Sequence, residues 1–199
     1  MQTMQRRALL TAAAGAAAAA TLAAVTLWRK PVAPRIATPI AGAEAPPALR
    51  PFSTLIATDP PRALVDVAFA DADGTAHHLA EFAGKGLVVN LWATWCVPCV
   101  AEMPALQDFA KAAPAGLLVL PLSSDRGGAA VVRAFYAAHG ISALPVWLDA
   151  RGAAAEAWGA RGLPTTLIVD RRGREVGYLE GAIDWAAEDT MAGVKRLVG

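Results

Sequence analysis

Cys96 and Cys99 are the two cysteines of this chain, and only Val97 and Pro98 separate them. Thiols at this spacing can close into a disulfide and reopen, so they can exchange disulfides with another molecule. In that exchange we expect Cys96 to attack a substrate disulfide and Cys99 to displace the substrate from the mixed disulfide. Val97 and Pro98 carry no charge, so the acidity of the Cys96 thiol must come mainly from its position in the fold.

The cysteines lie between a predicted strand and a predicted helix. Residues 87–93 are apolar except for Asn90, which indicates a buried strand, and a helix is predicted from Cys96 to about Ala113. A thiol at the start of a helix meets unpaired N–H groups and the positive end of the helix dipole, and both stabilise a thiolate. We expect Pro104 to kink this helix, because proline lacks an N–H and crowds the preceding turn.

Three other roles of the cysteine pair stay open at this point. A structural disulfide here would close a very short loop and would therefore remove little entropy from the unfolded chain. A zinc site needs four ligands, but the chain has no second CxxC, and His77 and His78 are adjacent rather than spaced. A copper-binding protein could use the dithiol as a soft ligand, although the chain holds only three histidines.

Glu102 is the candidate for moving protons at this site. It follows Cys99 by three residues, so the two side chains share one face of the predicted helix. A partly buried carboxylate there can take up or deliver the Cys99 proton as the disulfide closes or opens. The alternative is a solvated glutamate that stabilises the first helical turn. We expect Asn90 to face the cysteines from the strand, but an amide cannot carry the proton.

A second segment, residues 162–165 with the sequence Gly-Leu-Pro-Thr, precedes the last long predicted strand. A proline between a glycine turn and a strand can adopt the cis form, which leaves the neighbouring backbone free to pair with an extended substrate. The candidate substrate-binding residues are Trp95, Val97, Pro98, Leu163 and Pro164.

The pattern around these motifs alternates strands with helices. Two short strands at 65–69 and 75–79 are predicted around a turn at 71–74. The later expected elements are strands at 117–122 and 145–148, helices at 129–139 and 153–158, a hairpin of strands at 165–170 and 175–179, and a closing helix at 185–198. This order predicts an α/β domain with a mixed central sheet flanked by helices.

Residues 1–30 predict a membrane signal. Residues 8–28 hold no charged side chain and are long enough, as a helix, to span a hydrocarbon core of ~30 Å. We favour an uncleaved signal anchor, with a cleaved signal peptide as the alternative. Arg6 and Arg7 precede the apolar run and fit either the twin-arginine or the general secretory route. Each interpretation places the C-terminal domain outside the cytoplasm.

Residues 31–61 differ in composition from both of their neighbours. Eight prolines fall there, which favours extended conformations and a semi-rigid linker. The globular domain is therefore expected over residues 62–199, and about 140 residues are enough for one hydrophobic core. A net charge of +1 without a basic cluster argues against nucleic acid as a partner.

Together these motifs resemble the TlpA/ResA/CcmG group of membrane-anchored thioredoxin-like proteins, and the TlpA branch most. The resemblance covers roughly residues 64–198. It rests on Leu91-Trp-Ala-Thr-Trp-Cys-Val-Pro-Cys99, Glu102-Met-Pro104, Gly162-Leu-Pro-Thr-Thr166 and the run 184–189. It implies a thioredoxin-like fold with an N-terminal β-hairpin extension, Pro164 in the cis form and Glu102 in the active-site carboxylate position.

The resemblance also implies a thiol–disulfide reductase on the periplasmic side of the bacterial inner membrane, anchored by its N-terminal segment. It would support the assembly of cytochrome c, or of cytochrome oxidase and its copper sites. The implied partners are protein clients with disulfides and a membrane electron donor of the DsbD/CcdA type, with no cofactor beyond the redox-active Cys96–Cys99 disulfide. A thiol oxidase or isomerase of the same fold is the alternative.

The sequence differs from the family pattern at two places, which bear on the thiol acidity and on the expected role. Val100 and Ala101 stand where relatives often carry basic residues after the second cysteine. This leaves the field around the thiols less positive. The Gly-Val-Tyr-Gly-x-Pro-Glu pattern of the CcmG branch is absent from the sequence, which favours a TlpA-like role over a dedicated cytochrome c role.

Overall fold

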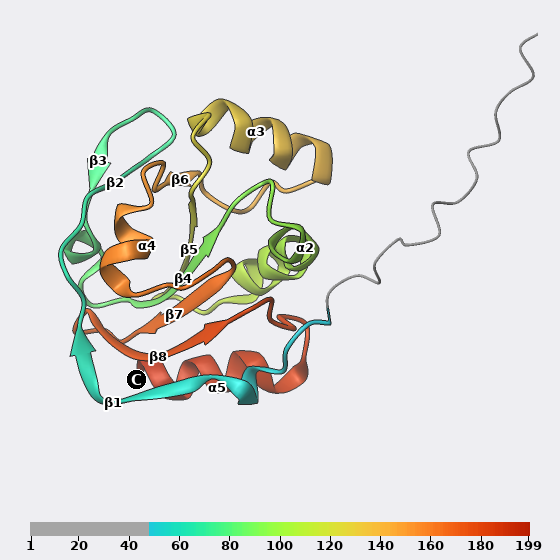
Figure 1. Ribbon diagram of the computed structural model, residues 1–199. Helices are drawn as coiled ribbons and strands as arrows, with labels where there is room; N and C mark the ends of the chain where they lie inside the picture. The colour runs from blue at the N-terminus through green and yellow to red at the C-terminus, as the bar shows by residue number, and fades with distance from the viewer. Residues whose placement is uncertain (1–47) are drawn as a thin grey trace, which may run out of the picture. The chain divides into compact units, whose positions relative to one another are not determined.

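The computed structural model of the protein describes residues 48–199 (Figure 1). The expected signal anchor or signal peptide at 1–30, and most of the expected linker, lie outside this range. Within the described part of the chain, no helix combines the length and the apolar character needed to cross a membrane.

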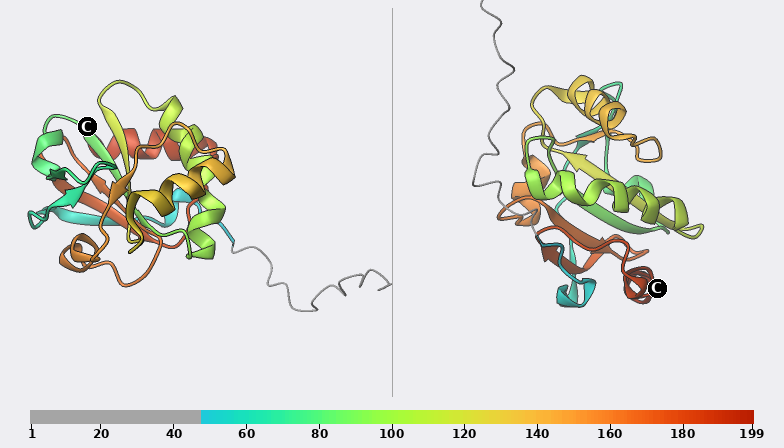
Figure 2. Two further views of the ribbon diagram at one scale, coloured as in Figure 1. Left: turned by 90° about the horizontal axis from the view of Figure 1, so that it is seen from above. Right: turned by 90° about the vertical axis from the view of Figure 1, so that its right-hand side faces the viewer.

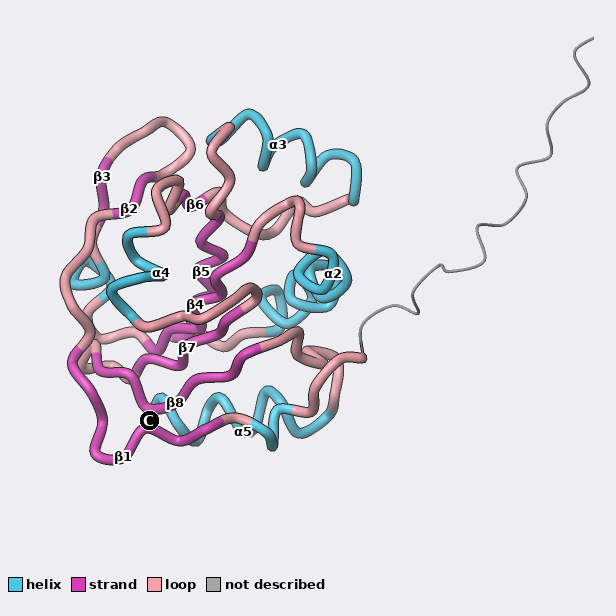
Figure 3. Tube along the Cα trace, viewed as in Figure 1, coloured by secondary structure: helices cyan, strands magenta, loops and turns pink. Residues whose placement is uncertain are grey.

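The described residues form one eight-stranded sheet with the strand order β1-β8-β7-β4-β5-β6-β2-β3 (Figure 3). At its centre, β4 (Gly86–Trp92) is parallel to β5 (Leu117–Ser123) and antiparallel to β7 (Thr165–Val169). β7 continues into the antiparallel β8 (Arg174–Glu180), and β5 pairs with the short parallel β6 (Trp147–Leu148). The predicted mixed central sheet is confirmed, and every residue of β4 is buried, as its apolar run predicts.

Helices cover both faces of this sheet (Figure 2). One buried cluster joins side chains of α2 (Val97–Ala112), α3 (Gly128–His139) and α5 (Glu188–Val198) with Val88 and Trp92 of β4. A second cluster, on the other face, joins α4 (Ala153–Trp158) with the alternate residues of the same strands. The four α-helices of the described residues begin and end within three residues of their predicted bounds, and α2 is helical on both sides of Pro104.

The expected N-terminal β-hairpin is present but short. β2 (Phe69–Ala70) pairs antiparallel with β3 (Ala76–His77), so the predicted strands at 65–69 and 75–79 shrink to two residues each. The 3₁₀ helix η2 (Leu79–Phe82) follows. The hairpin adds to the sheet through β6, which pairs with β2.

The linker expected over 31–61 ends earlier than the prolines predicted. The 3₁₀ helix η1 (Phe52–Thr54) and the strand β1 (Ile56–Ala63) belong to the domain, and β1 pairs antiparallel with β8. Phe52 is buried in the core against Gly193, where a Cβ would lie 2.6 Å from the ring. The prolines at 60 and 61 are tolerated because β1 is an edge strand whose register shifts between Ala57 and Arg62.

Candidate active site

Cys96 and Cys99 form a disulfide at the start of α2, with an S–S distance of 2.02 Å. Cys96 is the N-cap residue of the helix, and its Sγ accepts a hydrogen bond from the Cys99 N–H at 3.3 Å. Cys99 is fully buried, and Cys96 is almost so. When the disulfide opens, the same amide and the helix dipole favour a thiolate on Cys96 over one on Cys99.

The loop that carries Cys96 is held from the end of the neighbouring strand. Thr94 donates two hydrogen bonds to the Asp125 carboxylate, from its N–H at 2.9 Å and from its hydroxyl at 2.7 Å. The Ser123 hydroxyl donates to the same carboxylate at 2.8 Å. Asp125 was missed by sequence reasoning, although the carboxyl ends of two parallel strands, β4 and β5, meet at this edge.

The predicted substrate-binding residues lie in two segments, the loop and first turn around the cysteines and the turn before β7. Trp95 and Val97 are largely exposed for apolar side chains, and Pro98 between the cysteines is half-buried. The Leu163–Pro164 peptide bond is cis, as the resemblance implies. Because Leu91 pairs with Thr165, Pro164 lies at the edge of the sheet where the cysteine loop leaves β4.

Glu102 is fully buried, so the alternative of a solvated glutamate is wrong. Its carboxylate accepts hydrogen bonds from three neutral donors: Ile183 N–H at 2.7 Å, Asn90 Nδ2 at 2.9 Å and the Trp185 indole at 3.1 Å. Burial raises the pKa of Glu102 from 4.5 to about 7, against the opposing effect of these three hydrogen bonds. Such a carboxyl group can gain or lose a proton near neutral pH.

Asn90 donates to Glu102 from the middle of β4, whereas the sequence predicted that it would face the cysteines; Ile183 and Trp185 were not predicted as partners of Glu102 either. They lie more than eighty residues from Glu102 in sequence, in the turn between β8 and α5. That turn is braced by Arg50, whose N–H donates to Ala182 and whose carbonyl accepts from Asp184. No local pattern predicts such a contact.

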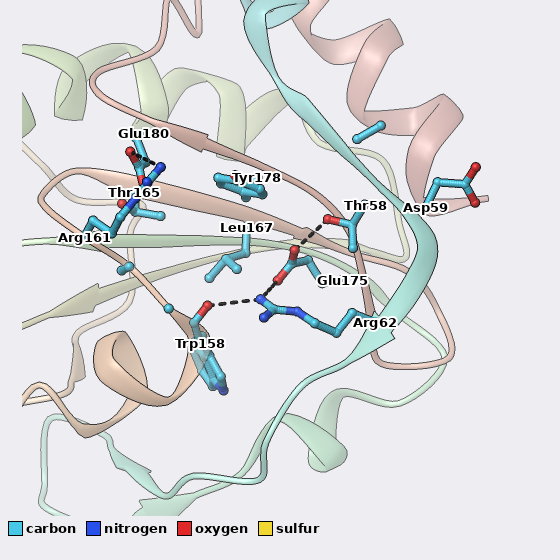
Figure 4. A pocket seen from close by; sticks show the side chains of 13 residues that line it. Thr58, Asp59, Arg62, Trp158, Arg161, Thr165, Leu167, Glu175, Tyr178 and Glu180 are labelled. Carbon is cyan, nitrogen blue, oxygen red and sulfur yellow. Dashed lines mark hydrogen bonds and ion pairs between the residues drawn. The ribbon is translucent and has the colours of Figure 1, made fainter.

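A cavity of about 480 Å³ lies away from the cysteines, between β1, β8 and the end of α4 (Figure 4). Four of its charged side chains are paired with one another. The buried Glu175 accepts from Arg62 and Thr58, and Arg161 donates twice to Glu180. With no thiol in its lining, the cavity offers none of the dithiol chemistry.

The residues that the structure describes hold no group of three or more His, Cys, Asp and Glu side chains placed to bind a metal ion.

The Redoxin family model matches residues 41–191 of the chain. The thiol-disulfide oxidoreductase ResA of Bacillus thuringiensis subsp. konkukian (strain 97-27) is 31% identical over 112 residues, which cover 56% of this chain and 64% of that protein. ResA of Geobacillus thermodenitrificans (strain NG80-2) is 29% identical over 119 residues, 59% of this chain and 67% of that protein. The chain thus spans about two thirds of the length of these relatives.

Solved structures show the same fold. The exposed lipoprotein thioredoxin Etrx1 from Streptococcus pneumoniae strain TIGR4 matches with a TM-score of 0.58 and 28% identity, over 67% of this chain and 100% of that one. A putative thiol:disulfide interchange protein DsbE from Chlorobium tepidum matches with a TM-score of 0.59 and 24% identity, over 71% and 99%. The thioredoxin-like fold is confirmed.

Proposed function

The chain belongs to the Redoxin family and is TlpA/ResA/CcmG-like, and we propose that it is a thiol–disulfide oxidoreductase. One observation carries the proposal: the two cysteines close into a disulfide at the first turn of α2, with Cys96 at its N-cap. A helix start stabilises the thiolate that attacks, and the sulfur it stabilises is the more exposed of the two.

In the reducing direction, the reaction has two exchange steps. The Cys96 thiolate attacks one sulfur of a client disulfide, which breaks the client S–S bond and releases the other client sulfur as a thiolate. Cys99 then loses its proton and attacks the Cys96 sulfur, so the Cys96–Cys99 bond forms and the client leaves as a second thiolate. The client gains two electrons and the enzyme loses two.

Glu102 serves the second step. Cys99 is buried one helical turn before it, so the proton of this thiol has no direct path to solvent. A carboxyl group with a pKa of about 7 accepts that proton at neutral pH and returns it when the disulfide is reduced again. Neutral hydrogen-bond donors stabilise the charge that Glu102 carries before it accepts the proton and again after it has returned it.

The client would bind over the apolar rim of the site. Trp95, Val97 and Pro98 would contact it on the side of the cysteines, and Leu163 and Pro164 on the other side. The backbone of Leu163, just before the start of β7, would pair with an extended segment of the client, which brings a client disulfide to Cys96.

We assign the direction and location from the N-terminal pattern and the family. The apolar run 8–28 supports an anchored, extracytoplasmic protein on the periplasmic side of the membrane. There a reductase needs a membrane electron donor, for which a DsbD/CcdA-type protein fits. Its clients would be proteins of cytochrome c assembly, or of cytochrome oxidase and its copper sites, whose cysteines must be reduced before they bind haem or metal.

The reduction potential of the Cys96–Cys99 couple in the full chain tests the direction. A value near that of thioredoxin, about −270 mV, supports the reductase, and one near that of DsbA, about −120 mV, overturns it in favour of the oxidase alternative. Cys99→Ser should accumulate a mixed disulfide with a model disulfide peptide. Cys96→Ser should not, and equal trapping by both variants would contradict the assignment of the nucleophile.

A further inference from the structure

The two carboxylate oxygens of Glu102 have different kinds of partner. Oε2 accepts hydrogen bonds from the Ile183 N–H and the Trp185 indole N–H. Both of these groups can only donate, so a proton on Oε2 would face two donors and no acceptor. Oε1 accepts a hydrogen bond from Asn90 Nδ2 at 2.9 Å. The proton that Glu102 gains therefore belongs on Oε1, the oxygen that faces Asn90.

Asn90 differs from the other two partners, because its amide carries both a donor and an acceptor. In the structure Nδ2 donates to Glu102 Oε1 and to Thr166 Oγ1, the latter at 3.1 Å. The other end of the amide, Oδ1, is buried without a hydrogen-bond partner among residues 48–199. A half-turn of the Asn90 amide about its Cβ–Cγ bond exchanges the positions of Oδ1 and Nδ2. Because Oδ1 has no partner, this rotation breaks no hydrogen bond at that atom.

We propose that Asn90 is a positioning residue whose amide turns over when Glu102 gains a proton, while the Thr166 hydroxyl changes from acceptor to donor. With Glu102 ionised, Nδ2 donates to both Oε1 and the Thr166 hydroxyl, as the structure shows. With Glu102 protonated, Oδ1 accepts from both. A hydroxyl group serves in either role, so the contacts among these three side chains are kept in both states, and the far end of the Asn90 amide has no partner among residues 48–199 in either one.

The position of Asn90 fits this role. It is fully buried and is the polar residue in the otherwise apolar strand β4, where an amide costs free energy unless its hydrogen bonds are made. The same burial that encloses Asn90 and Glu102 raises the pKa of Glu102 to about 7, so both protonation states are populated near neutral pH.

The other groups packed around Glu102 decide whether a different side chain could take the proton. The titratable groups beside it on α2 are the thiols of Cys96 and Cys99 once the disulfide is reduced. In the turn after β8, the Asp184 carboxylate accepts from the Ala186 N–H. β4 and β7 contribute the neutral Asn90 and Thr166. The use of the turnover in catalysis rests on the proposed exchange reaction; the turnover itself requires only that Glu102 titrates.

Nuclear magnetic resonance of the oxidised full chain tests the turnover directly. The side-chain amide protons of Asn90, assigned by their loss in Asn90→Ala, should show nuclear Overhauser contacts to Thr166 at pH 9. These contacts should be lost at pH 5, with a midpoint at the Glu102 titration. The same contacts at both pH values would overturn the proposal, whether or not the protein exchanges disulfides.

Glu102→Gln provides a second, independent test. At the Oε2 position the Gln side chain meets two donors, so its carbonyl oxygen must lie there and its NH₂ must lie at the Oε1 position. This NH₂ needs an acceptor, so Asn90 must turn its Oδ1 toward position 102. We expect this variant to lack the Asn90–Thr166 contacts at pH 9 as well as at pH 5. Glu175→Gln, which changes a buried carboxylate on β8, is the control and should keep the wild-type loss of the Asn90–Thr166 contacts between pH 9 and pH 5. Wild-type contacts at pH 9 in Glu102→Gln would overturn the proposal.

Discussion

Glu102 on α2 and Glu175 on β8 are equally withdrawn from solvent, with 0% and 1% of their surface exposed, but their partners differ. Glu175 meets the Arg62 guanidinium and the Thr58 hydroxyl, both from β1 (Figure 4). Glu102 meets an amide side chain, a backbone N–H and an indole. One carboxylate has a cation beside it, and the other has only neutral donors.

The difference separates a structural carboxylate from a chemical one. The pairing of Glu175 with Arg62 joins two residues that face each other in the register of β1 and β8, so it fixes an edge strand. No cation compensates the burial of Glu102, and this burial raises its pKa to about 7. Burial of a carboxyl group therefore indicates proton chemistry only where a compensating charge is missing.

The largest difference between the two glutamates should appear in the rate of disulfide exchange. Glu102→Gln removes the proton acceptor for Cys99 and should slow single-turnover oxidation of the reduced protein at pH 7 on the order of 100-fold. Glu175→Gln should change this rate by no more than about twofold, because a residue outside the reacting groups leaves the barrier unchanged. Stopped-flow fluorescence with a small disulfide measures both, and equal losses would break the comparison.

The pH dependence of stability gives the next largest effect. The pKa of Glu102 rises from 4.5 in the unfolded chain to about 7 in the folded one, so the folded state binds the proton more tightly. Its contribution is complete below pH 4.5 and is lost as the pH rises to 7, a decrease of roughly 3 kcal/mol in the free energy of unfolding.

Urea unfolding of the oxidised protein between pH 4.5 and pH 8 measures this decrease. Other groups titrate over the same range, so the relevant quantity is the difference between wild type and Glu102→Gln, in which position 102 has no proton to lose. If both proteins lose stability in parallel, Glu102 does not titrate between these values.

The smallest effect concerns the cation beside Glu175. Arg62→Ala leaves a buried carboxylate without its partner and should lower the free energy of unfolding by about 2 kcal/mol, reduced from the value for a fully buried pair because the Arg62 side chain is 51% exposed. Arg161→Ala is the matched control. Its side chain is 76% exposed and pairs with Glu180 at the surface, so the loss should stay under about 1 kcal/mol. Equal losses would show that burial of Glu175 does not matter.

The sequence predicted the local parts of the fold and of the site. The apolar run of β4 predicted a strand that is buried at every residue, and α2 and α4 bury residues three or four positions apart, as helices do. The spacing of Cys99 and Glu102 predicts that both lie on one face of the helix, because residues three apart share a helical face, and both side chains are buried on α2.

Other parts needed the folded chain. Composition assigned residues 52–61 to a linker, since prolines favour extended chain, but Phe52 and β1 gain enough from burial and pairing to join the domain. The ion pair of Arg62 with Glu175 and the bond of Thr94 to Asp125 likewise join segments far apart in sequence. No periodicity links such residues.

The sequence by itself determined that this protein has a dithiol at a helix start, in a thioredoxin-like α/β domain, with a carboxyl group one turn further on. Tertiary structure alone decided what that carboxyl group can do. The turn after β8 and the middle of β4 enclose Glu102 with neutral donors and bring no cation to it. A pKa depends on desolvation and neighbouring charge in three dimensions, and at Glu102 these depend in part on residues more than eighty positions away.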